Sequence, residues 1–191
     1  SEYPVDDVRK EKIAMFCNVR EQDIISNPDM ENVYELPLLF EEQKFGEKVL
    51  EKFNLKPTGS DMKEWKEAVA KMKNASGSLK IGIVGKYFDI GDYKLSDSYI
   101  SVIEAVKHAS AWHGVKPDIV WIDSKEFEKS PEKLVNLSGL AGIIVPGGFG
   151  SKGVEGKIAA IKYAREKDIP FLGLCYGLQL AVIEFARNVC G

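Results

Sequence analysis

The chain has 191 residues, 45% of them hydrophobic, and its 26 basic and 29 acidic side chains leave a net charge of -3. This length suits one ordinary domain or two partial ones, and so slight an acidity argues against a general nucleic-acid surface. No apolar run approaches the roughly 18 residues of a membrane span, and no leader pattern opens the chain. Three cysteines without metal-ligand spacing indicate reduced thiols and no metal site. Taken together, these features lead us to expect a cytoplasmic protein with no membrane segment and no nucleic-acid partner.

The first part of the chain combines one apolar run with several charged stretches. Ile13 to Val19 is predicted to be a short strand. Helices are predicted over Leu38 to Lys44, Glu47 to Phe53 and Asp61 to Lys73. Thr58-Gly59-Ser60 suits a turn and N-cap before the last helix, and Asn74 to Ser78 is typical of a linker. We therefore predict that the organisation of the chain changes near residue 78.

From Leu79 onward, strands and helices are predicted to alternate four times. The strands are expected at Lys80 to Val84, Asp118 to Ile122, Ala141 to Val145 and Phe171 to Leu174. Short continuous apolar runs of this kind favour a parallel sheet that is covered on both faces. The fold class is therefore α/β, with a doubly wound parallel sheet whose functional loops gather at the carboxyl ends of the strands.

Two of the intervening helices show an apolar face. The first carries Tyr99, Val102, Ile103 and Val106, with Asp97-Ser98 as caps and Gly114 as a stop. The third, Val154 to Lys167, places Ile158, Ile161 and Ala164 on one face. Both histidines, His108 and His113, are expected on the surface of the first helix.

The strongest sign of chemistry is Cys175, which ends the last strand and has Gly173 and Gly177 two residues away on either side. This is the layout of a nucleophile elbow, in which the chain passes so close to the nucleophile that only glycine fits. The helix beginning near Tyr176 would favour the thiolate over the thiol. An ordinary buried cysteine is the alternative. Cys17 and Cys190 lack such surroundings and are expected to be packing residues.

A glycine-rich loop follows the preceding strand and strengthens this prediction. Val145 to Gly150 would emerge at the same sheet edge as Cys175. Its N-H groups, those of Gly147 and Gly148, could form an oxyanion hole together with the N-H of Tyr176. The run from Gly148 to Gly153 also spells G-x-G-x-x-G, but no acidic residue follows at the distance that a dinucleotide fold requires.

Seven segments together resemble the class I glutamine amidotransferases and, among them, the CTP synthase family. They are Lys12 to Val19, Ile83 to Tyr87, Asp97 to Tyr99, Val102 to Ala105, Val145 to Gly150, Gly153 to Ile158 and Gln179 to Val189. The resemblance covers nearly the whole chain. It implies an internal piece of a longer protein, with the end of an α/β amidoligase domain at 1–57, a helical linker at 58–78 and the first half of the glutaminase domain at 79–191.

The same resemblance implies roles for individual residues of the glutaminase part. Cys175 would take ammonia from glutamine through a thioester, assisted by a histidine and a glutamate that the family carries after the nucleophile segment. The glutamine-binding residues would be Gly148, Phe149, Tyr176, Gly177, Leu178 and Gln179. Because both histidines of this chain precede Cys175, we expect the isolated chain to be nearly inactive.

For the amidoligase part, the resemblance implies that ATP and Mg²⁺ drive the amination of UTP to CTP in a homotetramer without a prosthetic group. Lys12 would contact the phosphates of UTP and CTP, and Asp29 and Met30 would lie near the ATP adenine. GTP would act as an activator. The loop from Phe88 to Leu95 is longer than is usual in the family, and Lys152 replaces a common arginine, so the strength of GTP activation stays open.

Two other functions remain possible from the residues alone. One is a stand-alone cysteine hydrolase with a similar elbow, although many of these place histidine directly after the cysteine, where this chain has Tyr176. The other is an assembly module that keeps the fold without turnover.

Overall fold

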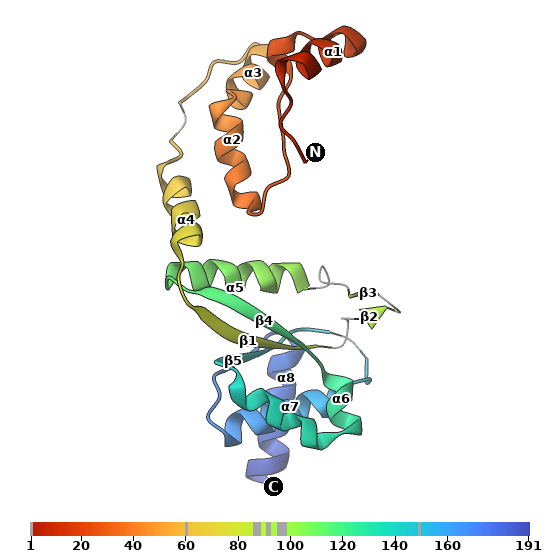
Figure 1. Ribbon diagram of the computed structural model, residues 1–191. Coiled ribbons are helices and arrows are strands. Elements are labelled where there is room, and N and C mark those ends of the chain that lie inside the picture. Colours follow the sequence, from red (N-terminus) through yellow and green to blue (C-terminus); the bar gives the residue numbers. More distant parts are fainter. Residues whose placement is uncertain (1, 60, 86–88, 91–92, 95–98, 149) are drawn as a thin grey trace. The chain divides into compact units, whose positions relative to one another are not determined.

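The computed structural model describes residues 2–59, 61–85, 89–90, 93–94, 99–148 and 150–191. The chain divides into two compact units, Ser1–Ala70 and Lys71–Gly191, with the boundary inside helix α4 (Lys63–Asn74) (Figure 1). The domain limits expected at 57/58 and 78/79 stay a prediction. No helix in the described ranges is both long and apolar enough to cross a membrane.

The first unit is built from short helices joined by extended segments. They are α1 (Asp7–Cys17), η1 (Glu21–Asp23), η2 (Val33–Glu35), α2 (Leu36–Glu42), α3 (Phe45–Lys52) and the first part of α4 (Lys63–Asn74). The Gln43 side chain fixes one extended segment, since its Oε1 accepts from Ser26 N at 2.7 Å and its Nε2 donates to Ser26 O at 2.8 Å. Trp65 Nε1 donates to Tyr34 O at 2.8 Å and ties α4 to η2.

The strand expected at Ile13 to Val19 is wrong, because these residues belong largely to helix α1. The helix is set by its ends. The Asp6 carboxylate accepts from Arg9 N at 2.8 Å, and Asn18 closes the helix in the left-handed region with φ 52°. The apolar run therefore lies on a capped helix, where Met15 and Phe16 are exposed.

The second unit contains a four-stranded sheet in the order β4-β1-β5-β6. Its strands are β1 (Ser78–Gly85), β4 (Lys116–Asp123), β5 (Gly142–Val145) and β6 (Phe171–Gly173), and every pairing is parallel. All four lie where the apolar runs predicted them, which confirms the parallel α/β fold. A separate antiparallel pair joins β2 (Asp89–Ile90) to β3 (Tyr93–Lys94).

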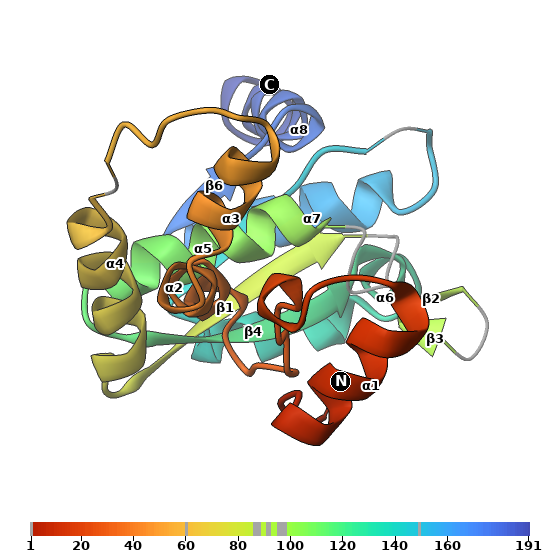
Figure 2. The same cartoon turned by 90° about the horizontal axis from the view of Figure 1, so that it is seen from above.

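Helices lie on both sides of this sheet, as expected for a doubly wound fold (Figures 1 and 2). One side carries α5 (Ile100–Trp112), which ends before Gly114 at φ +71° as predicted. The other side carries α6 (Ser124–Lys129), η4 (Pro131–Gly139), α7 (Val154–Glu166) and α8 (Tyr176–Phe185), with η5 (Ala186–Cys190) continuing α8. The caps expected at Asp97-Ser98 and at Ser60 lie outside the described residues.

The main core lies between the sheet and α7. Ile158, Ile161 and Ala164 are buried there, which confirms the predicted face of that helix. The same cluster includes Val84 and Val145 from the strands and Leu180 from α8. This packing holds the start of α7 and the start of α8 against the carboxyl ends of β5 and β6.

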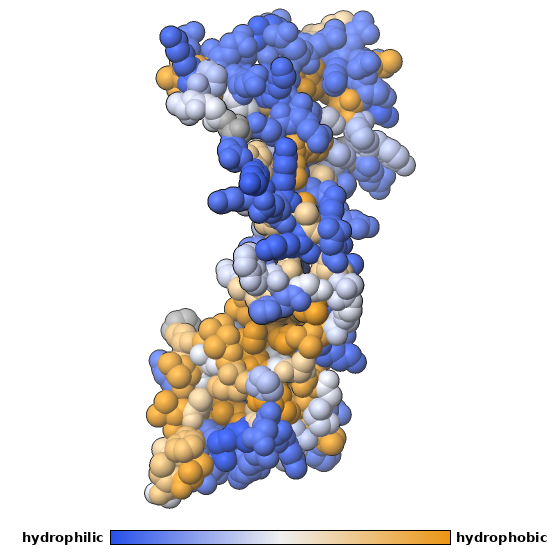
Figure 3. Space-filling view, turned by 90° about the vertical axis from the view of Figure 1, so that its left-hand side faces the viewer, coloured by the Kyte–Doolittle hydropathy of each residue, from blue (hydrophilic) through white to orange (hydrophobic). Residues whose placement is uncertain are grey.

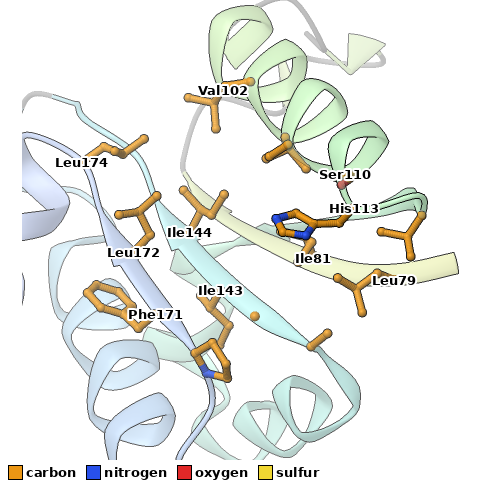
Figure 4. A pocket seen from close by; sticks show the side chains of 17 residues that line it. Leu79, Ile81, Val102, Ser110, His113, Ile143, Ile144, Phe171, Leu172 and Leu174 are labelled. Carbon is orange, nitrogen blue, oxygen red and sulfur yellow. The ribbon is translucent and has the colours of Figure 1, made fainter. Parts of the chain in front are cut away.

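The opposite sheet face is covered only in part. An apolar groove of about 520 Å³ runs between α5 and strands β5 and β6, where Val102, Ile144, Leu172 and Leu174 face one another (Figure 4). The visible face of the second unit is accordingly rich in apolar side chains, whereas that of the first is mostly hydrophilic (Figure 3).

Candidate active site

Cys175 occupies the tight junction between β6 and α8. Its backbone has φ 52° and ψ -108°, a conformation that a residue with a side chain rarely adopts, and its thiol is exposed. Strain of this kind persists where the surrounding structure enforces it, and it is typical of a nucleophile elbow. An exposed, strained cysteine argues against the alternative of an ordinary buried thiol.

The glycines beside Cys175 are there for steric reasons, as predicted. A Cβ atom on Gly173 would lie 2.7 Å from the backbone of Gly177 and Leu178. A Cβ atom on Gly177 would overlap the carbonyl oxygen of Val145. Helix α8 can therefore begin this close to β5 and β6 only because both positions lack a side chain.

The glycine-rich loop after β5 reaches Cys175. A Cβ atom on Gly147 would lie 3.5 Å from Cys175 Cβ and 3.8 Å from its Sγ, so Gly147 faces the thiol directly. Leu174 N donates to Val145 O at 3.0 Å and keeps the two loops in register. Gly148 is half-buried beside them, and Phe149 lies outside the described residues.

The first turn of α8 supplies the remaining candidates. Tyr176 is the first residue of the helix, where an N-H group has no intrahelical acceptor. Gln179 N donates to Cys175 O at 3.2 Å, which places Gln179 one turn beyond the nucleophile. Leu178 and Gln179 are exposed and Gly177 is buried. The structure thus brings Cys175, Gly147 and Tyr176 together at one sheet edge.

Two buried charged residues of α7 and α8 were not predicted from the sequence, one near the Cys175 edge and one near the far ends of these helices. Lys157 on α7 is 1% exposed, and its Nζ donates to Pro146 O at 3.4 Å. Glu184 on α8 is also 1% exposed and accepts from Arg165 Nη2 at 2.7 Å and Nε at 3.0 Å. The hydrogen bonds to Glu184 raise the pKa of Arg165. In both cases the sequence signal was a charged residue at a position of the helix face that is otherwise apolar, namely Lys157 on α7 and Glu184 on α8.

The other cysteines and the histidines are not part of this arrangement. Cys17 and Cys190 are exposed, so the expectation that they are packing residues is wrong. His108 and His113 are exposed on or just after α5, as predicted. His113 lies beside Leu79 near the amino end of β1, whereas Cys175 follows the carboxyl end of β6 (Figure 4).

The nucleotide candidates lie in the first unit. Lys12 is exposed on α1, Asp29 is exposed and Met30 is half-buried, both in an extended segment. Within the described ranges no group of three or more His, Cys, Asp or Glu side chains could hold a metal ion.

An ion-pair cluster ties η1 to α3 in the same unit. The Asp23 carboxylate accepts from Arg20 Nε at 2.9 Å and from Lys52 Nζ at 2.7 Å. These hydrogen bonds, that from Arg20 first, lower the pKa of Asp23 to about 2.

The apolar groove beside α5 is unsuited to glutamine. Apart from Ser110 and His113, the side chains that line it are apolar, and an amino acid substrate needs partners for its amide, ammonium and carboxylate groups. The exposed edge at Cys175, with its backbone N-H groups, is chemically the better site for such a substrate.

Comparison with known proteins matches both parts of the chain. Residues 1–55 match the family model described as CTP synthase N-terminus, and residues 94–191 match glutamine amidotransferase class-I. CTP synthase of Sulfolobus acidocaldarius is 50% identical over 98% of this chain and 35% of its own length. CTP synthase of Pyrococcus abyssi is 49% identical over 100% of this chain and 34% of its own length.

A solved structure agrees with these matches. The glutaminase domain of Trypanosoma brucei CTPS with bound acivicin aligns with a TM-score of 0.53 and 43% identity, covering 59% of this chain and 42% of that one. The present chain spans about a third of the length of the curated relatives that it matches. Since family models match both of its parts and relatives are about half identical along nearly all of it, the chain belongs to the CTP synthase family.

Proposed function

We propose that this chain supplies the nucleophile of a glutamine-dependent CTP synthase. The Cys175 thiolate attacks the amide carbon of glutamine, and the resulting oxyanion accepts hydrogen bonds from the N-H groups of Gly147, Gly148 and Tyr176. The amide nitrogen takes up a proton and leaves as ammonia, so that a thioester remains on Cys175. Water then hydrolyses this thioester and releases glutamate. The histidine and glutamate that the family carries after the nucleophile segment would move the protons.

The substrate would lie along the first turn of α8 and the glycine-rich loop. Gly148, Phe149, Tyr176, Gly177, Leu178 and Gln179 are the proposed glutamine-binding residues. Exposed Gln179 stands one turn from the thiol, within the reach of a polar group on the substrate. Gly177 contributes through its backbone, because its missing side chain lets α8 start where it does.

The ammonia would be used in the amidoligase part of the full-length protein. There ATP, with Mg²⁺, would phosphorylate the uracil 4-oxygen of UTP, and ammonia would displace that phosphate to give CTP. Lys12 would contact the UTP or CTP phosphates, and Asp29 and Met30 would lie near the ATP adenine. We further propose a cytoplasmic homotetramer that GTP activates.

The observation that carries this proposal is the strained backbone of Cys175, with Gly147 so near that a Cβ atom there would lie 3.8 Å from Cys175 Sγ. Similarity to CTP synthases along nearly the whole chain favours this function over a stand-alone hydrolase. In the full-length protein, Cys175→Ala should abolish CTP formation from glutamine and leave formation from added ammonium salts intact.

A matched control separates this role from thiol chemistry in general. Cys190→Ala removes another exposed thiol of the same unit and should change neither activity. Equal loss of both activities in Cys175→Ala, with an unchanged melting temperature, would contradict the proposed role of Cys175.

A further inference from the structure

We infer that Lys157 is a positioning residue for the oxyanion hole, because its side chain holds the peptide that carries the Gly147 N-H. This inference rests on the proposed glutaminase function. Lys157 lies in the first turn of α7, is 1% exposed, and donates from Nζ to the carbonyl oxygen of Pro146 at 3.4 Å. Pro146 is itself fully buried, so water does not readily replace the amine at this carbonyl.

The geometry of a trans peptide links this carbonyl to the active site. The C=O of Pro146 and the N-H of Gly147 belong to one planar peptide group, and in a trans peptide they point in opposite directions. The described chain contains no cis peptide bond. A donor that holds the Pro146 oxygen on the α7 side therefore turns the Gly147 N-H away from α7. Gly147 lies against Cys175, where that N-H can meet an oxyanion.

Without such a hold, this peptide could rotate at low cost. Its second residue is glycine, which accepts backbone conformations that other residues avoid. A rotated peptide would present a carbonyl oxygen where the oxyanion needs a donor, and that reverses the electrostatic effect. A donor with its own fixed anchor would oppose this rotation.

Lys157 has that anchor. Its own N-H donates to Gly153 O at 3.1 Å in the first turn of α7. The neighbouring Gly156 packs so tightly that a Cβ atom there would overlap the carbonyl oxygen of Ser124, and Gly156 N donates to Glu128 Oε1 at 3.4 Å. The backbone next to Lys157 is therefore held against α6, while the Lys157 side chain extends to the Pro146 carbonyl oxygen.

The test compares three variants in the full-length protein. Lys157→Met removes the donor but keeps a long side chain that suits a buried site, and Lys157→Arg restores a donor. Lys162→Met is the matched control, because Lys162 lies on the same helix and reaches Asn188 Oδ1 at the surface. Glutamate formation, CTP formation from ammonium, alkylation of Cys175 by iodoacetamide and the melting temperature are measured for each.

Lys157→Met should lower kcat for glutamine hydrolysis by roughly tenfold to a hundredfold, approaching the loss of one oxyanion donor, with little change in KM. Ammonium-dependent synthesis, the alkylation rate and the melting temperature should stay at wild-type values. Lys157→Arg should recover most of the lost kcat, and Lys162→Met should behave as wild type. A merely structural lysine would not produce lost turnover together with intact stability.

Several results would overturn the inference. These are an unchanged kcat in Lys157→Met, a parallel loss of both activities with a lower melting temperature, and a matching fall in Cys175 alkylation. Amide hydrogen exchange gives a readout without activity: exchange in the segment 146–153 should rise in Lys157→Met and not in Lys162→Met. If the wild-type protein makes no CTP from glutamine, the proposed function fails, and hydrogen exchange alone then decides whether Lys157 holds the loop.

Discussion

The backbone of Gly177 passes so close to the carbonyl oxygen of Val145 that a Cβ atom at position 177 would overlap it. Gly177→Ala should therefore push α8 away from β5 and lower the free energy of unfolding by at least about 2 kcal/mol. Urea unfolding followed by circular dichroism measures this loss. Gly139→Ala is the control, since a Cβ atom there meets nothing within 4 Å. Equal stability of the two variants would mean that α8 tolerates a shift here.

Lys12→Ala in the full-length protein should raise the half-saturation concentration of UTP by about tenfold or more, because a hydrogen bond from an ammonium to a phosphate oxygen would be lost. Glutamine hydrolysis at Cys175 should stay near its normal rate. Lys10→Ala is the matched control, because Lys10 lies on the same helix and its Nζ is 3.8 Å from Asp7 Oδ1. An unchanged UTP dependence in Lys12→Ala would make Lys12 an ordinary solvated charge.

The purified 191-residue chain should release almost no ammonia from glutamine. Both of its histidines are exposed on or just after α5, and His113 lies near the amino end of β1, at the opposite end of the sheet from Cys175. Backbone donors without a general base leave only a residual rate. A coupled glutamate assay on repurified chain checks this, and turnover that disappears in His108→Ala or His113→Ala would contradict it.

Asp23 should stabilise the first unit above about pH 4 and lose this effect in acid. Its pKa falls from the ordinary 3.8 to about 2 through hydrogen bonds from Arg20 and Lys52. A lowered pKa means that the folded state binds the proton less readily than the unfolded state, so the stabilisation disappears as pH falls from 3.8 toward 2. The carboxyl carbon resonance of Asp23 should report this titration, and Lys52→Met should move its midpoint upward. A midpoint near 3.8 in the unmodified chain would contradict the ion-pair geometry.

Much of the second unit follows from sequence because its central strands are buried, β5 over its whole length and β1 over its last four residues. Runs such as Ala141 to Val145 are apolar without alternation, and only a central strand of a parallel sheet needs that composition. The elbow at Cys175 was also predictable, because close backbone passage requires glycine at 173 and 177. In both cases a strong local constraint leaves few residue choices.

The errors arose where several local signals competed. Ile13 to Val19 has the composition of a strand, but Asp6 and Asn18 cap it as part of a helix, and the caps decide. Lys157 and Glu184 lie on buried faces together with Ala160, Ile161 and Leu180, at spacings of three and four residues. A charged side chain on such a helix face can be exposed to solvent or buried against a partner, and only the tertiary structure distinguishes these two environments.

The order of the strands also has a consequence for synthesis on the ribosome. Strand β1 is made before β4 and β5, which are its neighbours in the described sheet, so it has no partner strand of that sheet until they follow. Pairing between segments this far apart in sequence is slow, and an unpaired apolar strand is prone to aggregate. Ile83 and Val84, which are fully buried in the folded chain, therefore stay without their partner strands until β4 and β5 have left the exit tunnel.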